Sequence, residues 1–115
     1  MSIGVANKPY LANSIDLDLE TFANAVAAGE VTVVDVREPH EFAAGHIPGA
    51  VNLPLSRFEP RNLPAAGGGT VVLLCQAGVR SLKALNAARA AGRDDLRHYP
   101  GGMSQWRMYG GDVEA

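Results

Sequence analysis

The chain contains a single cysteine, Cys75, and its surroundings are those of a reactive thiol. It directly follows residues 70–74, an apolar, β-branched run that predicts a buried strand. A short loop containing Gly78 comes next, and then an Ala- and Leu-rich stretch over residues 81–91 that predicts a helix. The amides of such a loop and the positive end of the helix can converge on the sulfur and stabilise its thiolate. The sequence therefore predicts an activated nucleophile in an anion-binding loop.

Residues 75–81, called the cysteine loop below, contain further groups that suit this chemistry. After the cysteine they are Gln76, Ala77, Gly78, Val79, Arg80 and Ser81. Arg80 adds a fixed positive charge and a planar fork of donors that suits an oxyanion. The alternative is that Cys75 is only a small buried hydrophobic residue ending a core strand, as a lone cysteine usually is. The composition of the loop favours the functional interpretation.

Asp35 and Arg37 close a strand predicted over residues 31–36, so we expect them at the same edge of the sheet as Cys75. We expect both to be structural. Asp35 would accept hydrogen bonds from neighbouring amides, and Arg37 would pair with Glu41 across one helical turn. A general-base role for Asp35 is the alternative.

His46 and Trp106 are further candidates for supporting residues. His46 lies in a Gly-His-Ile-Pro-Gly segment, and we expect it to brace the turn into the next strand rather than to act as an acid or base. We expect Trp106 to fill the core under or beside the cysteine loop. His40 and His98 have no ligand spacing with His46, so no metal site is expected.

The composition bounds the class of protein. The 115 residues suit one domain, and 47% hydrophobic and 19% charged residues are an ordinary globular balance. The net charge of −2 gives no sign of a nucleic-acid or anionic-membrane surface. No apolar run approaches the ~20 residues that span a bilayer, and the start lacks the pattern of a secretory signal. We therefore expect a cytoplasmic protein with neither a membrane nor a nucleic-acid partner.

Predicted strands alternate with predicted helices along the chain. The helices are expected at residues 18–28, 38–44 and 81–91 and around Trp106, with helical turns at 56–63, and the strands at 31–36, 49–53, 70–74 and 96–99. On the helix over 81–91, we expect Leu82, Leu85 and Ala88 on one face. The alternation predicts the α/β class, with a small open, mainly parallel sheet and helices on both faces. Residues 1–13 are expected to form an N-terminal arm, and residues 14–115 a single domain.

Three segments together resemble the motifs of the rhodanese family. They are CQAGVRS at residues 75–81, VDVREPHEF at 34–42 followed by GHIPGA at 45–50, and YPGGMSQW at 99–106. They occur in the family's order, and the resemblance runs from about residue 15 to 106. The chain is thus similar to single-domain members of the family, which implies a rhodanese-like fold.

The resemblance implies a sulfurtransferase. The Cys75 thiolate would attack the outer sulfur of a donor such as thiosulfate and release sulfite. The resulting persulfide would pass its sulfur to cyanide or to a thiol acceptor, which includes a protein thiol. Such covalent catalysis in two half-reactions predicts ping-pong kinetics and needs neither a metal nor an organic cofactor. A general base at Asp35 is not required.

Related folds also host cysteine phosphatases and arsenate reductases. A phosphatase signature has one residue more between its cysteine and arginine than separates Cys75 from Arg80 here. The shorter loop should hold a single sulfur atom better than a phosphoryl group. Leu74 also stands where many phosphatases carry histidine. The loop therefore favours sulfur transfer.

Gln76 departs from the family pattern, because many active members carry arginine directly after the cysteine. The departure removes a positive charge from the mouth of the site, so we expect thiosulfate to be a weaker donor. It leaves a second hypothesis open, a sulfur-relay or binding module with little independent thiosulfate activity. A protein partner such as a cysteine desulfurase would then load Cys75.

Overall fold

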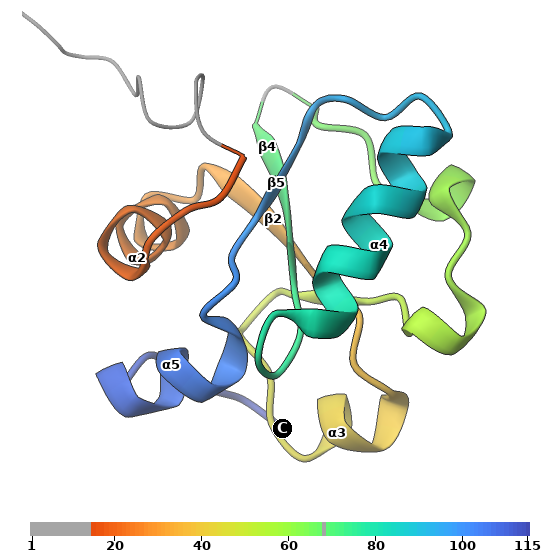
Figure 1. The fold of residues 1–115 in the computed structure, drawn as a ribbon. Helices are drawn as coiled ribbons and strands as arrows, with labels where there is room; N and C mark the ends of the chain where they lie inside the picture. The colour runs from red at the N-terminus through yellow and green to blue at the C-terminus, as the bar shows by residue number, and fades with distance from the viewer. Residues whose placement is uncertain (1–14, 68) are drawn as a thin grey trace, which may run out of the picture.

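In the computed structural model, which describes residues 15–67 and 69–115, four parallel strands form one sheet in the order β3-β2-β4-β5 (Figure 1). The strands are β2 (Val31–Asp35), β3 (Val51–Asn52), β4 (Thr70–Leu74) and β5 (Leu96–His98). Parallel neighbours need crossover connections, which place helices over the faces of the sheet. The α/β class and the parallel sheet expected from the sequence are confirmed.

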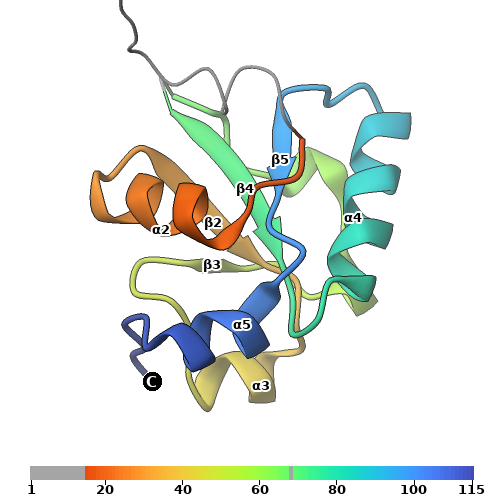
Figure 2. The same cartoon turned by 60° about the vertical axis from the view of Figure 1, so that its left-hand side comes forward.

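Helices cover both faces of the sheet, as Figures 1 and 2 show. They are α2 (Leu19–Ala27), α3 (Pro39–Ala43), α4 (Val79–Ala90) and α5 (Gly102–Tyr109), with 3-10 turns at η1 (Leu55–Arg57) and η2 (Pro60–Asn62). The helix α4 packs on one face, and α2 and α5 pack on the other. The arm expected at residues 1–13 lies outside the described residues.

The alternation of side chains along the strands divides the core into two clusters. Val72 and Leu74 of β4 pack with residues of α2 and α5 such as Phe22. Leu73 and Cys75 point to the opposite face, where they pack with residues of α4 such as Leu85. Cys75 therefore continues the α4-facing row of β4, and its sulfur lies beside the start of that helix.

The helix after the cysteine begins earlier than the sequence predicted. The Ala- and Leu-rich composition placed its start at Ser81, but α4 begins at Val79. Gly78 adopts a φ of +93° as its N-cap, which lets the chain turn directly into the helix. Leu82 was expected on one face with Leu85 and Ala88, but it is 47% exposed whereas those two residues are buried. The buried face of α4 instead consists of Ser81, Ala84, Leu85 and Ala88.

The other elements lie where the sequence placed them, with ends shifted by one or two residues. Asp18 caps α2 by accepting a hydrogen bond from the Thr21 amide at 2.8 Å. Pro60 separates the segment predicted over 56–63 into η1 and η2. Within the described ranges, no helix has the length and apolar character needed to cross a bilayer.

Candidate functional site

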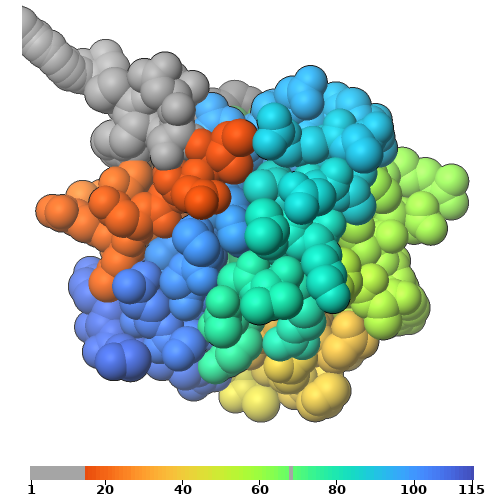
Figure 3. Space-filling view, in the orientation of Figure 1, coloured from red at the N-terminus to blue at the C-terminus, as the bar shows by residue number. Residues whose placement is uncertain are grey.

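The candidate site lies at the carboxyl ends of β2 and β4, the two central strands. The chain passes outward from β2 to β3 and, on the other side, from β4 to β5, so the strand order reverses between the central pair. Ligands of open α/β sheets bind beyond the strands at such a point. Cys75 follows β4 here, and Asp35 ends β2. Figure 3 shows the cysteine loop and the start of α4 reaching the surface between α3 and α5.

Three groups of the cysteine loop converge on the sulfur of Cys75. The amides of Gly78 and Ser81 lie 3.2 and 3.3 Å from Sγ, and the Ser81 hydroxyl lies 3.3 Å from it. Burial opposes the thiolate, since Cys75 is only 1% exposed. Hydrogen bonds from Ser81, Ala77 and Gly78 outweigh that burial and lower the pKa of the Cys75 thiol. The structure thus brings together the amides that the sequence placed around the sulfur.

The carbonyl groups of the same loop are turned away from the sulfur by α5. The Met103 amide donates to the Cys75 carbonyl at 2.9 Å, and the Ser104 amide donates to the Gln76 carbonyl at 3.1 Å. Gly102 has a φ of +64°, and a Cβ atom there would lie 2.5 Å from each of these carbonyl oxygens. Only glycine fits this contact. Gly102 therefore lets α5 bind these two carbonyls, and the peptide unit that joins the Gln76 carbonyl to the Ala77 amide presents that amide to the sulfur.

Arg80 is held by an ion pair at the edge of the site. Its Nη1 and Nη2 lie 2.6 and 3.0 Å from the two carboxylate oxygens of Glu41 on α3. The hydrogen bonds from Arg80 outweigh burial and lower the pKa of Glu41 to about 2. The same pair raises the pKa of Arg80. The guanidinium fork is thus occupied by a carboxylate in this structure.

The expected pair between Arg37 and Glu41 does not form. Arg37 instead places Nη2 2.8 Å from the Asp35 carboxylate and 2.8 Å from the Gly45 carbonyl. Asp35 is fully buried, so its charge needs a buried cation, and Arg37 is 3% exposed. Asp35 also accepts the Arg37 amide at 3.0 Å, in agreement with the expected capping. Asp35 and Arg37 therefore tie the end of β2 to the turn after α3.

His46 and Trp106 make structural contacts. The Nδ1 atom of His46 lies 2.7 Å from the Phe42 carbonyl oxygen, and its ring stacks on the Phe42 ring at 3.7 Å. These contacts brace the turn, as expected. Trp106 packs edge-on against Phe22 of α2 and donates Nε1–H to the Asp112 carbonyl at 2.9 Å. Its ring fills the core on the α2 side, whereas Gly102, Met103 and Ser104 of α5 contact the cysteine loop.

Sequence reasoning missed one buried polar group, His98 at the end of β5. Its Nε2 lies 2.7 Å from the Ser81 hydroxyl and its Nδ1 lies 3.2 Å from the Asp16 carboxylate. Burial lowers the pKa of His98, and the bond to Asp16 partly offsets this effect. These three residues are far apart in the sequence, so no spacing could have connected them. A histidine in a short strand beside the cysteine strand was the only available signal.

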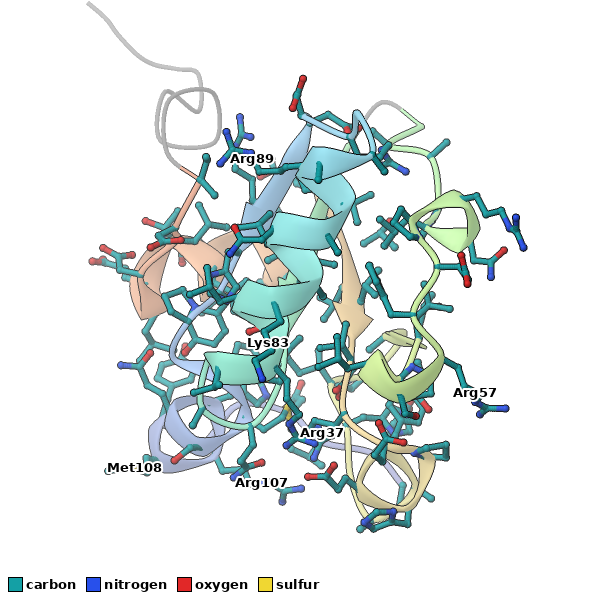
Figure 4. The ribbon with its side chains drawn as sticks, turned by 45° about the vertical axis from the view of Figure 1, so that its right-hand side comes forward. Arg37, Arg57, Lys83, Arg89, Arg107 and Met108 are labelled. Atoms are coloured by element: carbon teal, nitrogen blue, oxygen red, sulfur yellow. The ribbon has the colours of Figure 1, made fainter. Side chains whose placement is uncertain are left out.

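Basic side chains from three different elements lie near the end of the molecule that carries the site (Figure 4). Figure 4 shows Arg37, Lys83 and Arg107 reaching the same end of the molecule from the β2–α3 turn, α4 and α5. Val79 of the cysteine loop is 65% exposed. Among the residues that the structure describes, no three His, Cys, Asp or Glu side chains gather in a way that could hold a metal ion.

Comparison with known proteins identifies the domain. The family model described as "Rhodanese-like domain" matches residues 18–109. The chain is 49% identical to the uncharacterized protein slr1261 of Synechocystis over 80 residues. The aligned segment covers 70% of this chain and 45% of that protein. It is 31% identical to the human thiosulfate:glutathione sulfurtransferase over 110 residues, covering 84% and 96% of the two chains.

A solved structure supports the same assignment. The human single-domain sulfurtransferase TSTD1 superposes with a TM-score of 0.71 at 31% identity, covering 84% of this chain and 97% of that one. The chain spans between 39% and 64% of the lengths of three curated relatives it matches. Those longer proteins contain segments without a counterpart here.

Proposed function

The chain belongs to the rhodanese-like family, and we propose that it is a sulfurtransferase that carries sulfane sulfur as a persulfide on Cys75. The observation that carries the proposal is the convergence of two amides and one hydroxyl on Sγ, within 3.3 Å. The two amides donate to the sulfur and favour an anion there, and a thiolate is the nucleophile that the reaction needs. The human relative named as a thiosulfate:glutathione sulfurtransferase supports the same class of reaction.

The transfer proceeds in two displacements at sulfur. The Cys75 thiolate attacks the outer sulfur of thiosulfate, a new S–S bond forms, and sulfite leaves with the electron pair of the broken bond. A thiolate acceptor or cyanide then attacks the outer sulfur of the persulfide, and the Cys75 thiolate is restored. Gln76, Ala77, Gly78, Val79, Arg80 and Ser81 form the loop that binds the persulfide in this proposal. The protein contributes position and hydrogen bonds, and the nucleophile is its own cysteine.

A second candidate function is a sulfur relay loaded by a protein persulfide. Two observations favour it over efficient use of thiosulfate. Gln76 is neutral, and the Arg80 fork is occupied by Glu41 in a two-point ion pair. The site therefore offers little unpaired positive charge from its own loop to a doubly charged anion. A neutral or protein-bound donor would not need that charge.

Intact-mass measurement of the protein after incubation with thiosulfate tests the proposal. The expected result is an adduct of one sulfur atom that is absent in Cys75→Ser and is discharged by cyanide. If thiosulfate leaves the protein unmodified while a persulfidated cysteine desulfurase transfers sulfur to it, the relay is the function. If neither donor loads Cys75 on folded, reduced protein, both candidates are refuted.

A further inference from the structure

His98 is a buried titratable group that the transfer chemistry does not use. It is 3% exposed, and its ring lies between the Ser81 hydroxyl on α4 and the Asp16 carboxylate before α2. Ser81 in turn contacts the Cys75 sulfur through its hydroxyl at 3.3 Å. The four side chains form one hydrogen-bonded chain from the sulfur of Cys75 to Asp16, whose side chain is 68% exposed.

The partners of His98 determine the direction of these hydrogen bonds. The ionised Asp16 carboxylate can only accept, so the facing Nδ1 carries a proton. In neutral His98, Nε2 is then an acceptor and takes the hydroxyl proton of Ser81. The Ser81 oxygen consequently presents a lone pair to Sγ and accepts from the thiol. In protonated His98, Nε2 donates instead, and the Ser81 hydroxyl is free to donate to an anionic sulfur.

We propose that Ser81, His98 and Asp16 form a relay that couples the ionisation of Cys75 to the protonation of His98. When the thiol ionises, its proton passes to the Ser81 oxygen while the hydroxyl proton of Ser81 passes to Nε2 of His98. One S–H bond and one O–H bond break, and one O–H bond and one N–H bond form. The product is a thiolate that accepts a hydrogen bond from Ser81, with an imidazolium that faces Asp16. His98 is thus a positioning residue that acts on the sulfur through Ser81.

The charged groups around the relay are compatible with this assignment. Asp16 is the charged partner of His98, and it favours the imidazolium against the cost of burial. Arg80 is the cation that acts on the sulfur from the first turn of α4, and Glu41 pairs with it from α3. The same direction of the Ser81 hydroxyl would stabilise an anionic persulfide. That last consequence rests on the proposed function, whereas the coupling between Cys75 and His98 does not.

The pH dependence of alkylation by iodoacetamide tests the coupling on the protein's single cysteine. In the unaltered protein we expect the rate to rise in two steps, because the thiolate reacts differently beside protonated and neutral His98. His98→Gln removes the titrating group and should leave one step. His40→Gln, the same change at an exposed histidine of α3, should keep two. A profile of His98→Gln that superimposes on that of the unaltered protein would overturn the proposal.

Two further measurements remain informative if His98→Gln fails to fold. Asp16→Asn changes a mostly exposed side chain, and loss of its charge disfavours the imidazolium. The thiolate–imidazolium pair should therefore be less populated, and the rate reached after the lower step should fall, by about two- to fivefold at pH 6. Linkage also requires that Cys75→Ala lower the pKa of the His98 ring, as followed by nuclear magnetic resonance. An unchanged His98 pKa in Cys75→Ala refutes the relay, and none of these measurements depends on sulfur loading.

Discussion

Replacing Gly78 by alanine should damage both the stability of the fold and the reactivity of Cys75. Gly78 has a φ of +93°, and a Cβ atom there would lie 2.7 Å from the Pro100 carbonyl oxygen. Its amide also donates to Sγ at 3.2 Å. Gly92, just after α4, offers a matched control, because it has a φ of +99° but a Cβ atom there would meet nothing within 4 Å.

The two substitutions share one cost and differ in another. A non-glycine residue with a positive φ destabilises the fold by ~1–2 kcal/mol, and we expect both variants to lose this much free energy of unfolding. At position 78 the methyl group also collides with backbone, so the loop must move, and we expect a total loss of ~3 kcal/mol. Movement of the Gly78 amide removes a hydrogen bond to a charged sulfur worth ~1.5 kcal/mol or more. The pKa of the Cys75 thiol should then rise by about one unit.

Urea unfolding and alkylation by iodoacetamide as a function of pH measure the two effects separately. Gly92→Ala should lose stability while the Cys75 pKa stays that of the unaltered protein. The reasoning is refuted if Gly78→Ala unfolds within ~0.5 kcal/mol of Gly92→Ala and alkylates with an unchanged pKa. A loss of stability without a change in pKa would show that the Gly78 amide does not stabilise the thiolate.

Three other substitutions separate the parts of the site and of the helix that follows it. Gln76→Arg should lower the KM for thiosulfate in steady-state assays by adding a cation beside the sulfur, and an unchanged or raised KM would contradict this. The pKa of Glu41 is about 2 in the folded protein and ~4.3 in the unfolded chain. The ionised carboxylate therefore stabilises the fold fully above the unfolded pKa, and this contribution is lost as pH falls through about 2. Glu41→Gln should lose that acid dependence in urea unfolding between pH 5 and 2, and parallel curves for the two proteins would exclude it. In the same assay, Leu85→Ala should lower the free energy of unfolding by ~2–5 kcal/mol, because Leu85 is buried. Leu82→Ala should lower it by less than ~1 kcal/mol, because Leu82 is half-exposed. Equal losses would contradict the assigned buried face of α4.

The sequence was sufficient to predict the sheet and the position of the cysteine in it. The β-branched runs that became β2 and β4 carry few polar residues, which is typical of strands buried on both faces. Because Cys75 directly follows β4, the rule that ligands bind beyond parallel strands placed it at the functional edge. These inferences depend on local composition and chain order, which a sequence states directly.

Contacts between segments far apart in the chain were harder to predict from the sequence. Helical spacing favoured a pair between Arg37 and Glu41, but the buried Asp35 carboxylate required a cation, and Arg80 lay closer to Glu41. The early start of α4 depends on the positive φ of Gly78, which packs against Pro100. Which carboxylate meets which cation depends on the packing of α3 against α4, and helical spacing carries no information about that packing.

The geometry at the sulfur also depends on α5, which binds the backbone carbonyls of the cysteine loop. The carbonyls of a buried loop need hydrogen-bond partners of their own. The Met103 and Ser104 amides supply those partners for Cys75 and Gln76, and the absence of a side chain at Gly102 allows the close approach. The third sequence motif therefore belongs to the site for a physical reason. It fixes the outer side of the cysteine loop, and the Gln76 carbonyl shares its peptide unit with the Ala77 amide, which bonds to the sulfur.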